Sequence, residues 1–225
     1  MILALETATE VCSVALQLED GQVIEKRQVG RGIHSEMLFV FLKQLMDEQN
    51  ICRDSLEEVL ISGGPGQYTG LRIGAAGLKG VLFGTDIPLF TLGTLEGFAA
   101  GLACRNRIGG KVHAVLDARR KHLYYQHFDI TEEECTSGEA ILGEIGHIDL
   151  KIKGGDNVIG TGLERLPSFG KADIRFFDRS YISAINLILA RRDPRFTGIF
   201  RPADPVRFEP EYMTTPNQSQ VQFRK

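Results

Sequence analysis

Short apolar runs separated by glycine, proline or polar turns recur along the first half of the chain and predict an α/β fold. Runs that alternate or are apolar throughout predict strands, and longer runs with apolar positions three and four apart predict helices. The expected order is three strands, a helix, a strand, a helix, a strand and a helix. The corresponding segments are 1–5, 11–18, 23–29, 35–46, 59–62, 70–83, 88–91 and 94–102. A meander that continues into strand–helix–strand units predicts a mixed sheet with helices on its faces.

The second half repeats part of this order. Strands are expected over 111–117, 123–130, 157–160 and 174–177, with a helix over 181–191. Each half opens with an apolar strand that ends in an acid, Glu6 or Asp117, before a short turn and another strand. This predicts a structural duplication, with an N-terminal lobe over residues 1–105, a C-terminal lobe over 106–225 and a hinge at 105–110. Four prolines after residue 197 predict a mostly irregular tail with disordered last residues.

Composition narrows the class of protein. Of the 225 residues, 43% are hydrophobic and 24% charged, which is typical of a soluble globular protein. The net charge of −3 gives no electrostatic reason to bind nucleic acid alone, and the basic runs at 119–121 and 191–192 are expected to cap or solvate secondary structure. The four cysteines form no C-x-x-C pair, which argues against zinc and disulfides. With neither a signal peptide nor a membrane span, we expect a cytoplasmic protein.

The segment 59–74 combines a strand, a glycine-proline turn and a glycine-studded helix. Such a layout often presents backbone N–H groups to an anion. It is not a Walker A loop, because Gly66 is followed by Gly70 after three residues and no lysine comes next. Its glycine spacing also differs from the Rossmann fingerprint. Two interpretations stay open: an anion-binding loop, and a tight turn that lets a helix pack closely.

Two carboxylates at equivalent strand ends give a second candidate site. Glu6 and Asp117 would lie at the mouth of a cleft between the lobes and hold magnesium with a nucleotide, or each would cap its own turn, which we favour. The residues of an anion or nucleotide site would be Glu6, Thr7, Gly64, Gly66 and Asp117. No two of the five histidines have the spacing of metal ligands on a predicted helix, so no metal site is expected. His34 is expected to serve in a turn or cap.

The first two predicted helices have unusual surfaces. Six consecutive apolar residues, Met37–Leu42, extend the apolar surface of the first helix nearly all round, whereas a helix on a sheet needs only a stripe. The second helix has Gly70, Gly74, Gly77 and Gly80, which would let another backbone approach. Both helices are either buried within the chain or, as we favour, bound by a partner. The predicted partner-binding residues are Met37, Leu38, Phe41, Leu42, Leu45, Gly70, Ile73, Gly74, Gly77, Leu78 and Val81.

Five segments resemble the TsaB (YeaZ) family, namely 2–8, 12–16, 34–36, 64–74 and 117–120. The most specific is Gly-Pro-Gly-Gln-Tyr-Thr-Gly-Leu-Arg-Ile-Gly at 64–74, supported by Asp-Ala-Arg-Arg at 117–120. The resemblance covers about residues 1–130, and beyond them it rests on length and strand order. Glu6 departs from the family pattern, in which the first acid is usually aspartate.

The resemblance implies the two-lobed fold shared by actin, Hsp70 and sugar kinases (ASKHA), with a mixed sheet and flanking helices in each lobe. It implies a non-catalytic paralogue of TsaD, the subunit that transfers a threonylcarbamoyl group to adenosine 37 of tRNAs reading ANN codons. The chain would be a scaffold or activating subunit that binds the TsaD-type subunit through first-lobe helices, joined by a TsaE-type ATPase. tRNA would be bound only indirectly, the isolated chain would form a homodimer, and neither a cofactor nor a membrane is expected.

The resemblance also bears on catalysis. The catalytic paralogue carries two metal-binding histidines as His-x-Glu-Gly-His. Here Glu96 and Gly97 are retained, but Thr94 and Phe98 stand at the histidine positions. Phenylalanine cannot bind a metal and a lone threonine is a poor ligand, which implies a pseudoenzyme without catalytic residues. The alternatives are an M22-type metallopeptidase, after the older label glycoprotease, and an ATP-binding kinase-like protein that uses glycine turns at 154–155 and 160–162.

Overall fold

The first of two mixed sheets carries the N-terminus. The structure is a computed structural model that describes residues 1–213. This sheet has the strand order β12-β5-β4-β1-β2-β3, with β1 antiparallel to β2 and parallel to β4. The strands are β1 (Ile2–Glu6), β2 (Val11–Gln17), β3 (Val23–Val29), β4 (Glu58–Ser62), β5 (Leu89–Leu92) and β12 (Arg201–Ala203).

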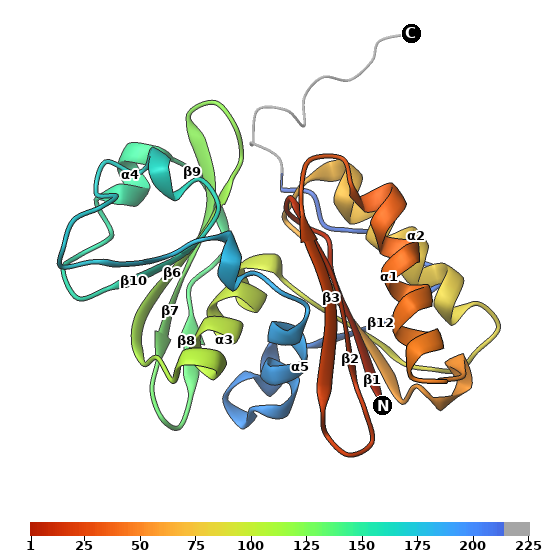
Figure 1. Cartoon of the computed structure of the whole chain (residues 1–225). Coiled ribbons are helices and arrows are strands. Elements are labelled where there is room, and N and C mark those ends of the chain that lie inside the picture. The colour runs from red at the N-terminus through yellow and green to blue at the C-terminus, as the bar shows by residue number, and fades with distance from the viewer. Residues whose placement is uncertain (214–225) are drawn as a thin grey trace, which may run out of the picture.

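Two helices, α1 (His34–Glu48) and α2 (Tyr68–Leu82), cover the outer face of this sheet (Figure 1). Leu38 of α1 lies against Gly77 of α2, where an added Cβ atom would stand 2.8 Å from the leucine Cδ2 atom. The small residues of α2 therefore permit a close approach between two helices of the same chain. The apolar run in α1 is divided, because Leu38 and Phe41 lie in the core whereas Phe39 is 51% exposed.

The second sheet has the order β11-β10-β6-β7-β8, and β9 also pairs with β7. Its central hairpin is β6 with β7, and β10 runs parallel to β6. The elements are β6 (Gly110–Asp117), β7 (His122–Ile130), β8 (Cys135–Ser137), β9 (Ile141–Glu144), α4 (Ile145–Asp149), β10 (Asn157–Gly160) and β11 (Arg175–Phe177). Short 3₁₀ segments lie at Arg53–Ser55, Leu163–Arg165, Arg179–Tyr181 and Pro194–Ile199.

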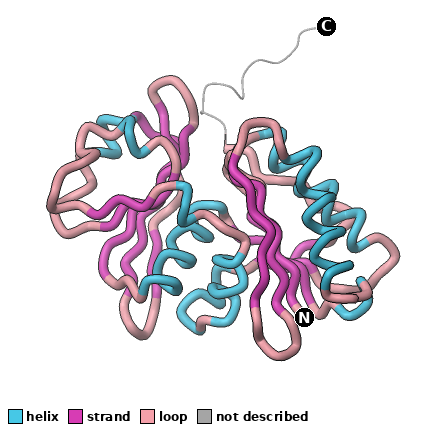
Figure 2. Tube along the Cα trace, in the orientation of Figure 1, coloured by secondary structure: helices cyan, strands magenta, loops and turns pink. Residues whose placement is uncertain are grey.

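Helices α3 (Thr94–Asn106) and α5 (Ile185–Arg192) lie between the two sheets (Figure 2). One buried cluster contains Leu60 of the first sheet, Phe98 of α3, Leu187 of α5 and Val112 of the second sheet. A single hydrophobic core therefore continues from one lobe to the other. This explains why α3 is buried on all sides over residues 94–103, since both of its faces meet a packed layer.

The predicted fold class, α/β with two mixed sheets and flanking helices, is confirmed, and every predicted strand and helix has a counterpart. The short elements β8, β9 and α4 were not predicted. Neither was β12, which lies where prolines predicted an irregular tail. An edge strand tolerates Pro202, because an edge position does not need a second row of N–H donors.

Strand β12 belongs to the first sheet, so the chain returns to that lobe near its described end. The division at residue 105 stays a prediction. The disorder predicted for the last residues concerns residues outside the described range of 1–213. Within that range, no helix has the length and apolar character needed to cross a bilayer.

Candidate functional site

The glycine turn between β4 and α2 is enclosed by backbone from two other segments. Gly63 O accepts a hydrogen bond from Glu211 N at 2.7 Å. A Cβ atom added to Gly64 would lie 2.3 Å from the carbonyl oxygen of Glu211. One added to Gly66 would lie 2.4 Å from the carbonyl oxygen of Ala8. Both glycines are therefore required for close packing of backbones, which supports the tight-turn interpretation over an anion-binding loop.

Glu6 ends β1 as a buried carboxyl group that is 1% exposed. Its Oε1 atom accepts from Ala8 N at 2.8 Å, and the Ser62 hydroxyl donates to its Oε2 atom. Burial raises the pKa of the Glu6 carboxyl from 4.5 to about 7, against the opposing effect of these two hydrogen bonds. The neighbouring Thr7 is also fully buried. Neither side chain reaches solvent, where a nucleotide would have to bind.

Asp117 ends β6 and has the equivalent bond. Its Oδ1 atom accepts from Arg119 N at 2.8 Å, two residues later, as Glu6 accepts from the N–H group two residues after it. The guanidinium group of Arg165 also donates to Asp117. Each acid therefore caps its own turn, the role that the sequence favoured, and the repetition is consistent with a duplicated lobe.

A cavity of about 330 Å³ lies between the lobes. Neither Glu6 nor Asp117 lines it, so the structure does not bring the two carboxylates together there. The cavity is lined from both sheets, among others by Gly64, Pro65, Glu96, Gln126, Glu139 and Arg201. The lining includes acidic and neutral polar side chains, and its guanidinium group, that of Arg201, already binds Glu96 at 2.9 Å.

The first turn of α3 holds the segment that resembles His-x-Glu-Gly-His. Thr94 is fully buried and Phe98 is 1% exposed within the core shared by the lobes. Glu96 accepts from Gly93 N at 2.7 Å and pairs with Arg201 of β12. The segment therefore caps α3 and holds β12. Among residues 1–213, no group of three or more His, Cys, Asp and Glu side chains is placed to hold a metal ion.

Two of the five histidines, His34 and His113, are buried and have hydrogen-bond partners. His34 begins α1, and its Nε2 atom lies 3.3 Å from Val11 O. A buried chain of hydrogen bonds that the sequence did not suggest joins Asp156 Oδ2 to His113 Nε2 and His113 Nδ1 to the Tyr125 hydroxyl, each at 2.9 Å. A carboxylate only accepts, so Nε2 carries the proton and Nδ1 accepts from the phenol. Burial lowers the pKa of His113 and raises that of Tyr125 to about 12, and both shifts favour the neutral side chain.

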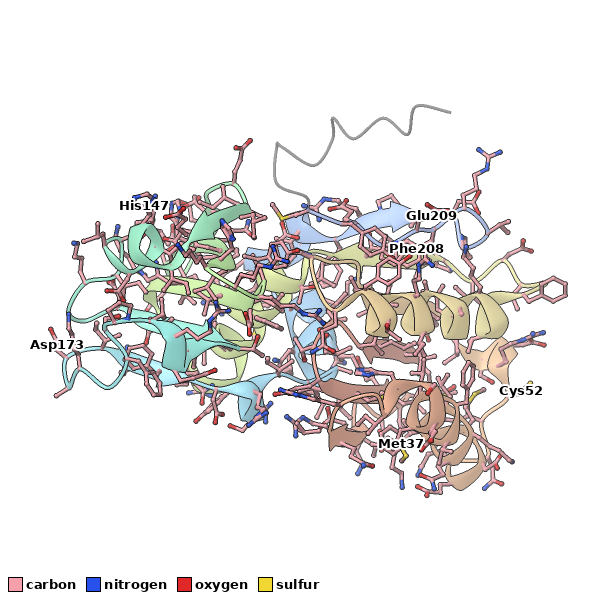
Figure 3. All side chains as sticks on the ribbon, turned by 90° about the horizontal axis from the view of Figure 1, so that it is seen from above. Met37, Cys52, His147, Asp173, Phe208 and Glu209 are labelled. Carbon is pink, nitrogen blue, oxygen red and sulfur yellow. The ribbon has the colours of Figure 1, made fainter. Side chains whose placement is uncertain are left out.

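The structure divides the predicted partner-binding residues into two groups. Met37, Ile73 and Val81 are partly exposed, and Figure 3 shows Met37 on the outside of α1. The buried group consists of Leu38, Phe41, Leu42, Leu45, Gly70, Gly74, Gly77 and Leu78. These eight pack within the chain and leave only the outer side of the two helices to a partner. The predicted partner-binding residues did not include Phe39 and Val40, which are 51% and 42% exposed on this outer side. The helical period could have identified them, because both lie between the buried positions Leu38 and Phe41.

The outer side of α2 is smooth. Thr69, Ile73, Ala76 and Gly80 are spaced four, three and four apart and so share one face. Ile73 is partly exposed and the other three are exposed. No atom would lie within 4 Å of a Cβ atom added to Gly80. We call these four residues, with Phe39 and Val40 of α1, the outer helix face.

Residues 204–213 run along α2 on the side away from α1 (Figure 3). The Tyr212 ring lies 5.2 Å from that of Tyr68, and the guanidinium carbon of Arg72 lies 4.2 Å above the Tyr68 ring. The Tyr124 hydroxyl of β7 donates to Met213 O at 3.2 Å. This segment therefore connects the start of α2 with the second sheet, and it forms one border of the outer helix face.

Comparisons with known proteins agree on a family. The family model described as "TsaD: tRNA N6-adenosine threonylcarbamoyltransferase" matches residues 28–159. The chain is 31% identical over 175 residues to the tRNA threonylcarbamoyladenosine biosynthesis protein TsaB of Escherichia coli (strain K12), covering 76% of this chain and 75% of that protein. It is 29% identical over 123 residues to the protein of the same name from Bacillus subtilis (strain 168), covering 55% of this chain and 52% of that protein.

Among solved structures, YeaZ from Pseudomonas aeruginosa superposes with a TM-score of 0.76. The sequence identity is 24%, and the superposition covers 94% of this chain and 99% of that one. This likeness shows that the two chains share a fold over nearly their whole lengths.

Proposed function

Because the chain belongs to the TsaB family, we propose that it is a subunit required to form N6-threonylcarbamoyladenosine in tRNA. The modified position would be adenosine 37 of tRNAs that read ANN codons. The chain would act as a scaffold or activator of a TsaD-type catalytic subunit, with a TsaE-type ATPase as a further partner. The name shared by the relatives, which refers to threonylcarbamoyladenosine biosynthesis, supports this role.

A non-catalytic role is supported by the first turn of α3. Phe98 fills a position in the shared core, and its ring has no lone pair to offer a metal. Thr94 is enclosed beside it. The transfer reaction would therefore be carried out by the partner subunit.

The observation that carries the proposed partner binding is the outer helix face. Phe39 and Val40 are exposed on one helix, and the helix that packs against it has a smooth outer stripe. Burying such a phenylalanine side chain contributes about 2 kcal/mol. Small residues on α2 would allow a partner helix to approach closely. In the absence of the catalytic subunit, the same face would pair with a second copy of this chain.

The test is capture of a TsaD-type subunit by the chain carrying Phe39→Glu with Val40→Glu. Placing carboxylates in a desolvated contact should weaken binding about 100-fold and abolish threonylcarbamoyladenosine formation in the reconstituted complex. Leu150→Glu is the matched control, because Leu150 is 70% exposed on the second lobe. Retention of both binding and modification by the double variant would refute the proposed interface. A wild-type complex that makes no threonylcarbamoyladenosine would refute the proposed function.

A further inference from the structure

The turn that joins β6 to β7 carries three exposed cationic side chains, Arg119, Arg120 and Lys121. The φ angles of the two arginines are +68° and +50°. Both angles lie in the left-handed region, which glycine, asparagine and aspartate adopt more readily than other residues. Arginine is strained there, because its Cβ atom is crowded by the backbone. Strained backbone conformations are found mainly at functional sites. The two guanidinium groups are therefore candidates for a binding role.

The backbone of this turn is fixed from several sides. Asp117 accepts from Arg119 N, and the Arg165 guanidinium group donates both to Asp117 and to Arg120 O. Lys121 O accepts from the first N–H group of α4 at 3.0 Å. The side chains of Arg119, Arg120 and Lys121 do not take part in these contacts. Within residues 1–213, no acidic group forms an ion pair with any of them. The turn therefore presents its cations outward from a rigid base.

We propose that this turn binds phosphate groups of the tRNA backbone through Arg119 and Arg120. This inference rests on the proposed function, which brings a tRNA to the complex. The planar fork of a guanidinium group donates two parallel hydrogen bonds to phosphate oxygens, and a turn that is fixed in advance loses little entropy on binding. Our expectations from the sequence are that tRNA is bound only indirectly and that the run 119–121 caps or solvates secondary structure, so a direct contact at this turn would depart from both expectations.

RNA is a better occupant than an acidic protein surface for one reason. The relatives are named for a modification of tRNA, and a tRNA presents a phosphate at every nucleotide. The chain as a whole is weakly acidic, with a net charge of −3, so this contact would be local and would add to the binding by the catalytic subunit.

The first half of the test separates the side chains from the turn. Arg119→Asn with Arg120→Gly places the preferred residues in the strained positions, and the melting temperature should stay unchanged or rise by roughly 2–4 °C. Asn50→Gly is the matched control, because Asn50 also has a positive φ (51°) and the change relieves strain without altering charge. A large fall in melting temperature of the double variant would mean that the arginines serve the fold, and would overturn the proposal.

The second half measures tRNA in the reconstituted complex. For Arg119→Asn with Arg120→Gly, the KM for tRNA should rise about tenfold at unchanged kcat, and the slope of log affinity against log salt should fall by about 2. Arg119→Lys with Arg120→Lys should keep the salt slope, and Asn50→Gly should change neither quantity. An unaltered KM and slope in an active complex would overturn this proposal and leave the proposed function standing. Loss of subunit association with unaltered tRNA binding would assign the turn to a protein partner and overturn it as well.

Discussion

The buried carboxyl group of Glu6 makes the stability of the first lobe depend on pH. Its pKa is about 7 in the folded chain, because burial disfavours the charged form, against 4.5 without that burial. Between these values the unfolded chain releases a proton that the folded chain keeps. Stability therefore falls as pH rises from 4.5 to 7, and Glu6 adds no further dependence below or above this interval.

The magnitude follows from the difference in pKa. Each pH unit in the interval corresponds to about 1.4 kcal/mol, so the ionisable group makes the folded state about 3 kcal/mol less stable at pH 8 than at pH 4.5. Glu6→Gln removes the ionisation and keeps the shape. The amide oxygen can still accept from Ala8 N, and the Ser62 hydroxyl can turn to accept from the amide nitrogen.

The assay is urea unfolding of the wild type and Glu6→Gln at a series of pH values from 4.5 to 8. The two proteins should be nearly equal at pH 4.5, and the variant should be about 3 kcal/mol more stable at pH 8. Glu19→Gln, at an exposed position, is the control and should follow the wild type throughout. A difference between Glu6→Gln and the wild type that stays constant across the series would refute the argument, because it would mean that Glu6 ionises alike in both states.

Two further predictions concern packing. Gly66→Ala should destabilise the chain by about 2 kcal/mol in urea unfolding, because its Cβ atom would meet the Ala8 carbonyl oxygen, whereas Gly80→Ala at an open helical position should stabilise it by about 1 kcal/mol. Equal effects of the two changes would contradict the enclosed turn. Phe98→His should lower the free energy of unfolding by about 3 kcal/mol, since a polar ring would replace an aromatic one in the shared core. An undiminished stability of that variant would contradict the packing of α3.

The spacing of apolar residues along the chain predicted most of the fold, because most helices and strands bury one face. Leu38, Phe41 and Leu45 of α1 are buried at helical spacing, and the sequence already showed that spacing. Strand β12 could not be predicted in this way. It consists of three residues, one of them proline, and its existence depends on pairing with β5, more than one hundred positions earlier in the chain. Local propensity carries no information about such a partner.

The candidate site was predicted less completely for a related reason. Glycine spacing shows that something approaches closely, but it does not identify the neighbour. Gly64 meets Glu211, Gly66 meets Ala8 and Gly77 meets Leu38, all within the chain. The exposed positions of α1 are those that lie between its buried positions. They can be identified only once it is known which face of the helix is buried.

The positions at which this layout would hold a ligand are occupied by the chain itself. Backbone of residues 8 and 211 fills the space beside the glycine turn, and Phe98 and Thr94 fill the start of α3. Glu6 is capped and enclosed, and Glu96 is paired. The chain therefore fills these positions at its strand ends with its own residues. We propose that function uses external surfaces instead, namely the outer helix face on the first lobe and the cationic turn on the second.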